Sequence, residues 1–250
     1  MKKIIIVCYR TDQFKSKINL ATYFQGWLMK EIPVDLAQKY HRISNVPYSI
    51  STSLDEETIT FTISLLDREA EKVFSDLLLD NQLVSFCLEA FPEDTFNILS
   101  KRTENLSKEE LAKVFYNGES DNGKFKIYFQ TPTSFKSNGK YVMYPDLRLL
   151  LQSLMRQYNC FFEGTQIIDR SLLDELLKHV YVSSYQLNSF HYPIHKVRIP
   201  AFLGHMSVIC KGNKTLANYL EVLLKIGEYT GVGIKTSMGM GAIKVRKMRR

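Results

Sequence analysis

The sequence predicts an α+β protein made of two tandem βαββαβ units, with a glycine-rich loop near the end of the second unit. Strand-like and helix-like apolar patterns follow one another in the same order in both halves of the 250-residue chain. A Gly-Glu-Ser-Asp-Asn-Gly run at residues 118–123 separates the halves. Four glycines also lie within residues 231–241. We therefore expect domains at residues 1–122 and 123–250.

The first half reads as one complete unit. A β-branched run predicts a buried first strand, and a turn-prone Leu54-Asp55-Glu56 separates the two middle strands. Apolar residues at helical spacing predict two helices, as at Phe24 and Leu28. The expected strands are residues 2–9, 46–52, 57–66 and 82–91, and the expected helices are 17–30 and 68–80. This β-α-β-β-α-β order is that of a ferredoxin-like (RRM-like) domain.

The second half repeats the order. Pro145 is expected to open its first helix and Thr215 to cap its second. The third strand is either 195–202 or 202–211, and the remaining elements are strands at 124–130, 180–188 and 242–247 with helices at 145–158 and 216–229. Between the halves, Ser107 and Glu110 form a capping box, with Leu106 and Leu111 placed as a hydrophobic staple.

Bulk composition excludes several classes of protein. No stretch approaches the ~20 apolar residues of a membrane span, and the short apolar run after Met1-Lys2-Lys3 does not resemble a signal peptide. The four cysteines lack Cys-x-x-Cys pairing, so we expect reduced thiols in a cytoplasmic protein. No Asp-x-Asp or His-x-x-Glu pattern lies near the glycines, so neither a metal nor a cofactor is expected.

The positive charge is concentrated at the C-terminal end. Residues 196–250 hold eleven Lys and Arg against two acids, whereas the preceding residues hold two more acids than bases. Such asymmetry favours a face that binds a polyanion such as a nucleic acid. The alternative is a solvated basic tail that only aids solubility.

The spacing of the glycines excludes two nucleotide-binding motifs. A dinucleotide fingerprint needs glycine where Thr236 stands, and a P-loop needs lysine after Gly239, where Met240 stands. Glycine permits positive φ and lets a phosphate approach without a Cβ in the way. Because a purely structural turn needs only one or two glycines, we expect the loop to present N–H groups, together with Lys235, to a phosphate backbone. Alanine there should then weaken binding rather than stability.

Four segments resemble one known family. GVGIKTSMGMG (231–241) is similar to the C-terminal signature of the CRISPR-associated repeat-processing endoribonucleases of the RAMP superfamily, a signature shared with non-catalytic relatives. Residues 36–53 (LAQKYHRISNVPYSISTS) resemble the family's histidine-bearing segment. Residues 129–154 and 200–209 resemble the opening of its second domain and the strand before its last helix.

The resemblance implies metal-independent RNA cleavage, in which a ribose 2′-OH attacks the adjacent phosphate and leaves a 2′,3′-cyclic phosphate and a 5′-OH. It implies CRISPR repeat RNA as partner, as precursor and processed guide, and leaves open a multi-subunit effector complex and a homodimer. His41 is the implied catalytic residue, with Lys39 and Arg42 as flanking cations. The expected RNA-binding residues are Gly231, Gly233, Lys235, Ser237, Gly239, Gly241, Lys136, Lys140 and Arg148.

Other histidines fit the chemistry less well. Pro193 interrupts the helix that a metal pair of His191 and His195 would need. His179 lies where it would cap a helix end, and His205 lies in an apolar strand, where a core or RNA-stacking role fits.

Several family relatives pair the histidine with a tyrosine on the preceding helix and a lysine shortly after it. This helix offers Tyr23, but Gly26 and Trp27 occupy the closer match, and Pro47-Tyr48 stands where the lysine is expected. Two alternatives remain: a non-catalytic RAMP subunit that coats guide RNA and does not need His41, and a ferredoxin-like sensor of small molecules, which explains the fold but not the charge.

Overall fold

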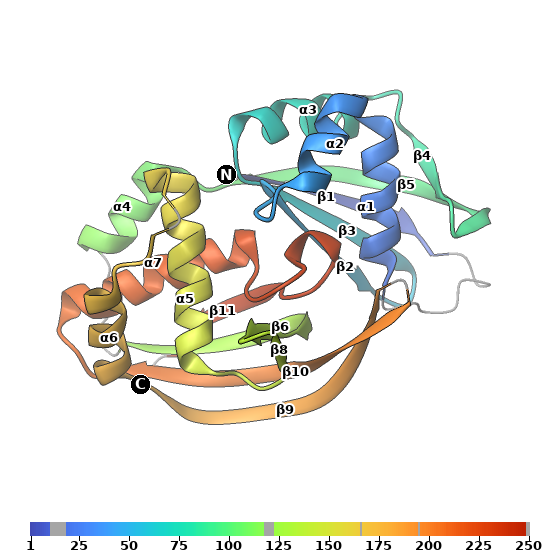
Figure 1. The fold of residues 1–250 in the computed structure, drawn as a ribbon. Helices are drawn as coiled ribbons and strands as arrows, with labels where there is room; N and C mark the ends of the chain where they lie inside the picture. The colour runs from blue at the N-terminus through green and yellow to red at the C-terminus, as the bar shows by residue number, and fades with distance from the viewer. Residues whose placement is uncertain (11–18, 118–122, 166, 195, 249–250) are drawn as a thin grey trace. The chain divides into compact units, whose positions relative to one another are not determined.

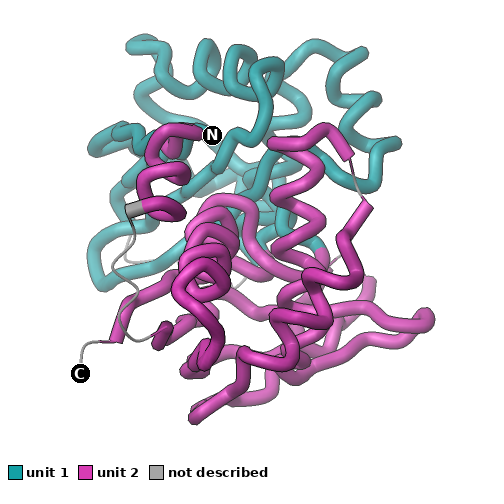
Figure 2. The backbone as a smooth tube through the Cα atoms, turned by 90° about the vertical axis from the view of Figure 1, so that its left-hand side faces the viewer, with its two compact units in different colours: residues 1–105, 235–239 teal, residues 106–234, 240–250 magenta. Residues whose placement is uncertain are grey.

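The computed structural model describes residues 1–10, 19–117, 123–165, 167–194 and 196–248. The chain forms two compact units (Figure 2): unit 1 comprises residues 1–105 and 235–239, and unit 2 comprises residues 106–234 and 240–250. The boundary expected after residue 122 adjoins residues 118–122, which lie outside the described residues. The compact units instead divide between Asn105 and Leu106.

Helix α4 (Lys108–Asn117) explains the position of this division. It packs on α7 (Lys214–Thr230) of unit 2, where the Asn218 amide Nδ2 donates a hydrogen bond to the Phe115 carbonyl at 2.8 Å. The helix begins with the predicted capping box: Glu110 N–H donates to Ser107 Oγ, and Ser107 N–H donates to the Glu110 carboxylate. Leu106 and Leu111 are both buried, as expected of a staple.

Unit 1 is built on a five-stranded antiparallel sheet (Figure 1) with the order β2-β3-β1-β5-β4. Helices α1 and α3 pack on one face of the sheet, where Ile4, Phe24, Phe61 and Phe74 are almost fully buried. The elements are β1 (Lys2–Tyr9), α1 (Leu20–Glu31), α2 (Val34–Arg42), β2 (Tyr48–Leu54), β3 (Thr58–Leu65), α3 (Arg68–Leu78), β4 (Ser85–Leu88) and β5 (Phe91–Asn105).

The closing strand of unit 1 differs from the prediction. Residues 82–91 were expected to be the strand that closes the βαββαβ order, but β4 pairs only with β5, at the sheet edge. Strand β5 closes the unit, pairing with β1 from Ile98 opposite Cys8 to Asn105 opposite Lys2. The prediction failed because most side chains of β5 are exposed and polar, so its apolar alternation is weak.

Unit 2 repeats the arrangement in a four-stranded antiparallel sheet with the order β11-β6-β10-β9. Helices α5 and α7 lie on one face of this sheet (Figure 1), and Leu154 of α5 and Leu223 of α7 are buried in the core. The elements are β6 (Lys124–Thr133), β7 (Phe135–Ser137), β8 (Lys140–Val142), α5 (Leu147–Tyr158), the π-helical turn η1 (Asn159–Glu163), α6 (Arg170–His179), β9 (Val180–Ile194), β10 (Val197–Cys210), α7 and β11 (Ile243–Lys247).

The structure confirms the predicted fold class. In each unit the fourth strand of the βαββαβ order lies beside the first, and the third lies between the first and the second. The two alternatives for the third strand of unit 2 are parts of one long strand, β10.

Two predicted helix starts are corrected. Asn213, not Thr215, caps α7, because its Oδ1 accepts a hydrogen bond from Leu216 N–H at 2.8 Å and Thr215 already lies inside the helix. Pro145 was expected to open α5, but the helix begins at Leu147, and Asp146 caps it in the same way by accepting from Leu149 N–H.

Candidate active site

Helix α2 places the predicted catalytic histidine on the surface of unit 1. Tyr40 is buried and packs against the rings of Tyr48 and Phe74 at 5.6 and 6.3 Å between centroids. Burial raises the pKa of the Tyr40 phenol well above its usual value. Tyr40 therefore anchors the last turn of the helix, while His41 and Arg42 are exposed beside it.

The two cations that flank His41 differ in their surroundings. Lys39 Nζ forms an ion pair with the Glu69 carboxylate of α3, and both side chains are about half exposed. Arg42 forms no ion pair with any of the described residues. The charge next to the imidazole that remains available to an anion is thus that of Arg42.

The tyrosines near this segment have structural roles. Tyr48 is fully buried and accepts a hydrogen bond from Gln25 Nε2 at 3.3 Å. Tyr23 packs edge-on against Phe91 and accepts a hydrogen bond from Asn19. Trp27 stacks on Phe86 in the core. None of these side chains provides the positive charge of the lysine that several family relatives carry shortly after the histidine.

The middle of the glycine-rich loop belongs to unit 1. Residues 235–239, which contain the 3-10 turn η2 (Thr236–Met238), pack on α1 and β2. The buried Thr22 hydroxyl of α1 donates a hydrogen bond to the Met238 carbonyl at 3.1 Å. Lys235, Ser237 and Gly239 therefore share a compact unit with His41, whereas Gly231, Gly233 and Gly241 lie in unit 2.

All four glycines have positive φ, between +70° and +97°. The argument that a turn needs only one or two of them is therefore wrong for this loop. A Cβ on Gly233 would lie 2.2 Å from the Ser134 carbonyl oxygen, and one on Gly241 would lie 2.0 Å from the Val232 carbonyl oxygen. Because these close neighbours are backbone atoms of the protein itself, we now expect alanine at Gly233 or Gly241 to lower stability.

Most amides of the loop are also engaged within the protein. Gly233 N–H donates to Ser153 Oγ, Gly241 N–H donates to the Pro132 carbonyl, and Val232 N–H donates to the Gly241 carbonyl, all at 2.8–3.0 Å. In the described part of the chain, the amides of Lys235, Thr236 and Ser237 have no such acceptor. Among the described residues, the amides of Gly239 and Met240 likewise have no such acceptor, so the centre of the loop, where the Lys235 side chain is also exposed, can present amides to a phosphate.

Comparison with known proteins identifies the family. The family model for the CRISPR-associated endoribonuclease Cas6 matches residues 127–243. A CRISPR-associated endoribonuclease Cas6 of Streptococcus thermophilus is 35% identical over 250 residues, which cover all of both chains. The chain belongs to the Cas6 family.

Solved Cas6 structures share the whole fold of this Cas6 chain, as the sequence resemblance implied. A Cas6 product complex superposes with a TM-score of 0.78 at 19% identity, covering 99% of this chain and 100% of the other. A Cas6 in which a histidine is mutated to alanine superposes with a TM-score of 0.74 at 19% identity, with the same coverage. At this identity the likeness shows the fold alone.

Three further basic residues expected to bind RNA lie in unit 2 of this Cas6 chain. Lys136 and Lys140 are exposed on the β7–β8 hairpin, where Lys136 Nζ lies 5.9 Å from the Tyr141 ring centroid. The hairpin turns at Asn138 and Gly139, which both have positive φ. Arg148 is exposed on α5, but it forms an ion pair with Asp174 at 3.2 Å, so part of its charge is compensated.

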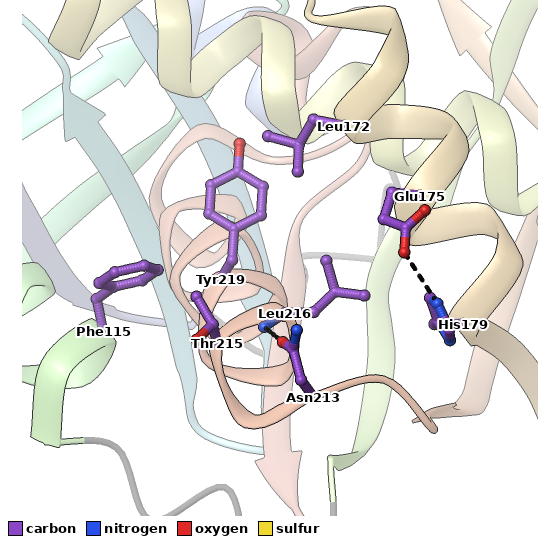
Figure 3. A pocket seen from close by; sticks show the side chains of 8 residues that line it. All are labelled: Phe115, Leu172, Glu175, His179, Asn213, Thr215, Leu216 and Tyr219. Carbon is purple, nitrogen blue, oxygen red and sulfur yellow. Dashed lines mark hydrogen bonds and ion pairs between the residues drawn. The ribbon is translucent and has the colours of Figure 1, made fainter.

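The other histidines have separate surroundings. His179 is hydrogen-bonded to Glu175 at the rim of a pocket of about 280 Å³ between α4, α6 and α7 (Figure 3). In the same pocket Asn213 caps α7, so these polar groups already have partners. His191 is exposed on β9, and His195 lies outside the described residues. His205 lies on β10 beside Tyr128.

The described residues hold neither a group of side chains suited to a metal ion nor a membrane-spanning helix. These residues contain no cluster of three or more His, Cys, Asp or Glu side chains suited to hold a metal ion. None of their helices has the length and apolar character that crossing a membrane requires.

Sequence reasoning missed three side chains that bind residues of the candidate site: two hold the glycine-rich loop, and one pairs with Lys39. Thr22 and Ser153 bind loop backbone groups from α1 and α5, and Glu69 pairs with Lys39. All three residues lie in helices at sites far from their partners in the sequence, where only the tertiary structure shows the contact.

Proposed function

We propose that this Cas6 chain cleaves CRISPR precursor RNA within its repeats, without a metal ion, to generate guide RNAs. Membership of an endoribonuclease family supports the reaction class. The observation that carries the proposal is the exposed imidazole of His41, next to Arg42 and in the same compact unit as Lys235 and Ser237. One of the structurally similar Cas6 proteins was solved as a variant in which a histidine is replaced by alanine.

The proposed reaction is an internal transesterification. The ribose 2′-oxygen attacks the adjacent phosphorus, the bond from phosphorus to the 5′-oxygen breaks, and the products end in a 2′,3′-cyclic phosphate and a 5′-OH. The 2′-OH must lose a proton and the leaving 5′-oxygen must gain one. His41 serves as the base or the acid in these transfers, for which a positioned imidazole typically contributes a factor of roughly 10² to 10⁴.

Positive charge must also stabilise the phosphorane-like transition state. Arg42 fits this role because its guanidinium is exposed and has no carboxylate partner in the described residues. Lys39 would have to exchange Glu69 for a phosphate oxygen, so its contribution is proposed to be smaller.

The RNA is proposed to contact the centre of the glycine-rich loop and the β7–β8 hairpin. Lys235 and the amides from Lys235 to Ser237 supply donors on the loop, and Lys136 and Lys140 supply charge on the hairpin. Gly231, Gly233, Gly239 and Gly241 act by shaping the loop.

The test is cleavage of a single repeat RNA in excess EDTA. We expect one cut, with a cyclic phosphate on the upstream product, and no cut when the nucleotide just upstream carries a 2′-deoxy substitution. Loss of activity in EDTA would refute the metal-independent mechanism. RNA binding without any cleavage would favour a non-catalytic guide-binding subunit.

A further inference from the structure

The sheet of unit 2 has a face that its helices do not cover. On β6, Phe125, Ile127 and Phe129 lie in the hydrophobic core, so Lys126 and Tyr128 lie on the opposite, open face. Both side chains are partly exposed.

The neighbouring strands add to this open face. Antiparallel register places His205 of β10 and Lys244 of β11 opposite Tyr128, and Arg246 of β11 opposite Lys126. Met206, next to His205, is buried in the core, and Val245, next to Arg246, packs against it, so His205 and Arg246 lie on the opposite face. Lys126, Tyr128, His205 and Arg246 are therefore one contiguous group, called here the Tyr128 face.

Two cations and an imidazole lie close to the Tyr128 ring. Lys126 Nζ is 5.3 Å from the ring centroid and Arg246 Cζ is 5.4 Å from it, and the His205 ring lies at 5.6 Å with a tilt of 43°. Cation–π contacts hold the two cations close to the tyrosine ring and leave their outer hydrogen-bond donors available.

The cations of β11 are not equivalent. Lys247 is paired with Glu221 at 2.8 Å, and Lys244 lies 3.9 Å from Glu228. Within the described residues neither Lys126 nor Arg246 forms an ion pair with a carboxylate. These two unpaired cations therefore lie beside the aromatic rings, where a base and its phosphates would need them.

We propose that the Tyr128 face binds an unpaired segment of RNA, with a base on Tyr128 and His205 and the adjacent phosphates on Lys126 and Arg246. Aromatic side chains stack on single-stranded bases, whereas the bases of a duplex already stack on one another. The inference rests on RNA being the substrate, and it places RNA on residues other than His41 and those of the glycine-rich loop.

The same sheet supplies a matched control. Tyr185 of β9 is 69% exposed and pairs with Met206, a core residue, so its side chain is on the other side of the sheet from Tyr128. Lys247 of the same strand as Arg246 pairs with Glu221 and is the corresponding control for charge.

The test is fluorescence anisotropy of a labelled decauridine RNA with the full chain. We expect Tyr128→Leu to raise Kd by about 5- to 100-fold, as loss of one stacked base does, and Tyr128→Phe and Tyr185→Leu to change it less than about twofold. Arg246→Ala should reduce the slope of log affinity against log salt by about 0.7, and Lys247→Ala should not.

Thermal unfolding of each variant separates binding from folding. If Tyr128→Leu unfolds, Arg246→Ala still tests the face, because Arg246 is exposed. Wild-type affinity of folded Tyr128→Leu, or an equal loss in Tyr185→Leu, would overturn the inference. Cleavage of repeat RNA by the wild-type chain is assayed separately, so that Tyr128-dependent binding without cleavage refutes the proposed function and leaves this inference standing.

Discussion

Alanine at Gly241 should destabilise the protein. With φ at +75°, the new Cβ would lie 2.0 Å from the Val232 carbonyl oxygen. Positive φ costs alanine about 1 kcal/mol relative to glycine. Relieving the clash would stretch the bonds from Val232 N–H to the Gly241 carbonyl and from Gly241 N–H to the Pro132 carbonyl, each contributing about 0.5–1.5 kcal/mol. The sum is about 2–4 kcal/mol.

For a chain of this size, such a loss lowers the melting temperature by roughly 5–15 °C, which circular dichroism resolves. Gly139→Ala isolates the backbone term, because φ is +78° but nothing lies within 4 Å of the new Cβ, so it should cost about 1 kcal/mol. Gly26→Ala lies in α1 with open space around it and should stabilise the protein by up to about 1 kcal/mol.

A Gly241→Ala protein that melts within 2 °C of wild type would refute this reasoning. It would mean that the loop rearranges freely and that its four glycines serve something other than its own conformation. Lys235→Ala is the complementary variant: its side chain is exposed, so we expect weaker RNA binding at an unchanged melting temperature.

Two further predictions concern His41's surroundings. Arg42→Ala should slow repeat cleavage more than Lys39→Ala in single-turnover assays, because Glu69 already compensates Lys39; equal effects would contradict this assignment. Thr22→Val removes the donor to the Met238 carbonyl at nearly constant volume and should cost about 1 kcal/mol while weakening RNA binding; wild-type affinity and melting temperature would show that this bond does not hold the loop.

The fold was largely predictable because, in both units, apolar residues recur at the spacing typical of strands and helices. Strand β5 was not predicted, because most of its side chains are exposed and the alternation of apolar and polar residues along it is weak. The β7–β8 hairpin was also missed, although Asn138-Gly139 is a strong turn signal. Thr215 was expected to cap α7, but threonine and asparagine are both good caps, and only the hydrogen bond from Leu216 N–H identifies Asn213 as the cap.

The site was predictable as a set of residue types but not as a set of contacts. His41, Arg42 and Lys235 are all exposed, as a binding role requires. Pairing of Lys39 with Glu69, or of Lys247 with Glu221, joins residues on separate elements, and local sequence patterns carry no information about it. The same holds for the loop amides, whose acceptors lie as far away in sequence as Ser153.

The most direct test of the proposed mechanism is single-turnover cleavage of repeat RNA in EDTA by His41→Ala. The account predicts a rate lower by roughly 10² or more with RNA affinity within about twofold of wild type, because the variant loses proton transfer and keeps the phosphate contacts. His191→Ala, which removes another exposed histidine, should cleave at the wild-type rate. An unchanged rate in His41→Ala would contradict the account and place the catalytic proton transfer elsewhere.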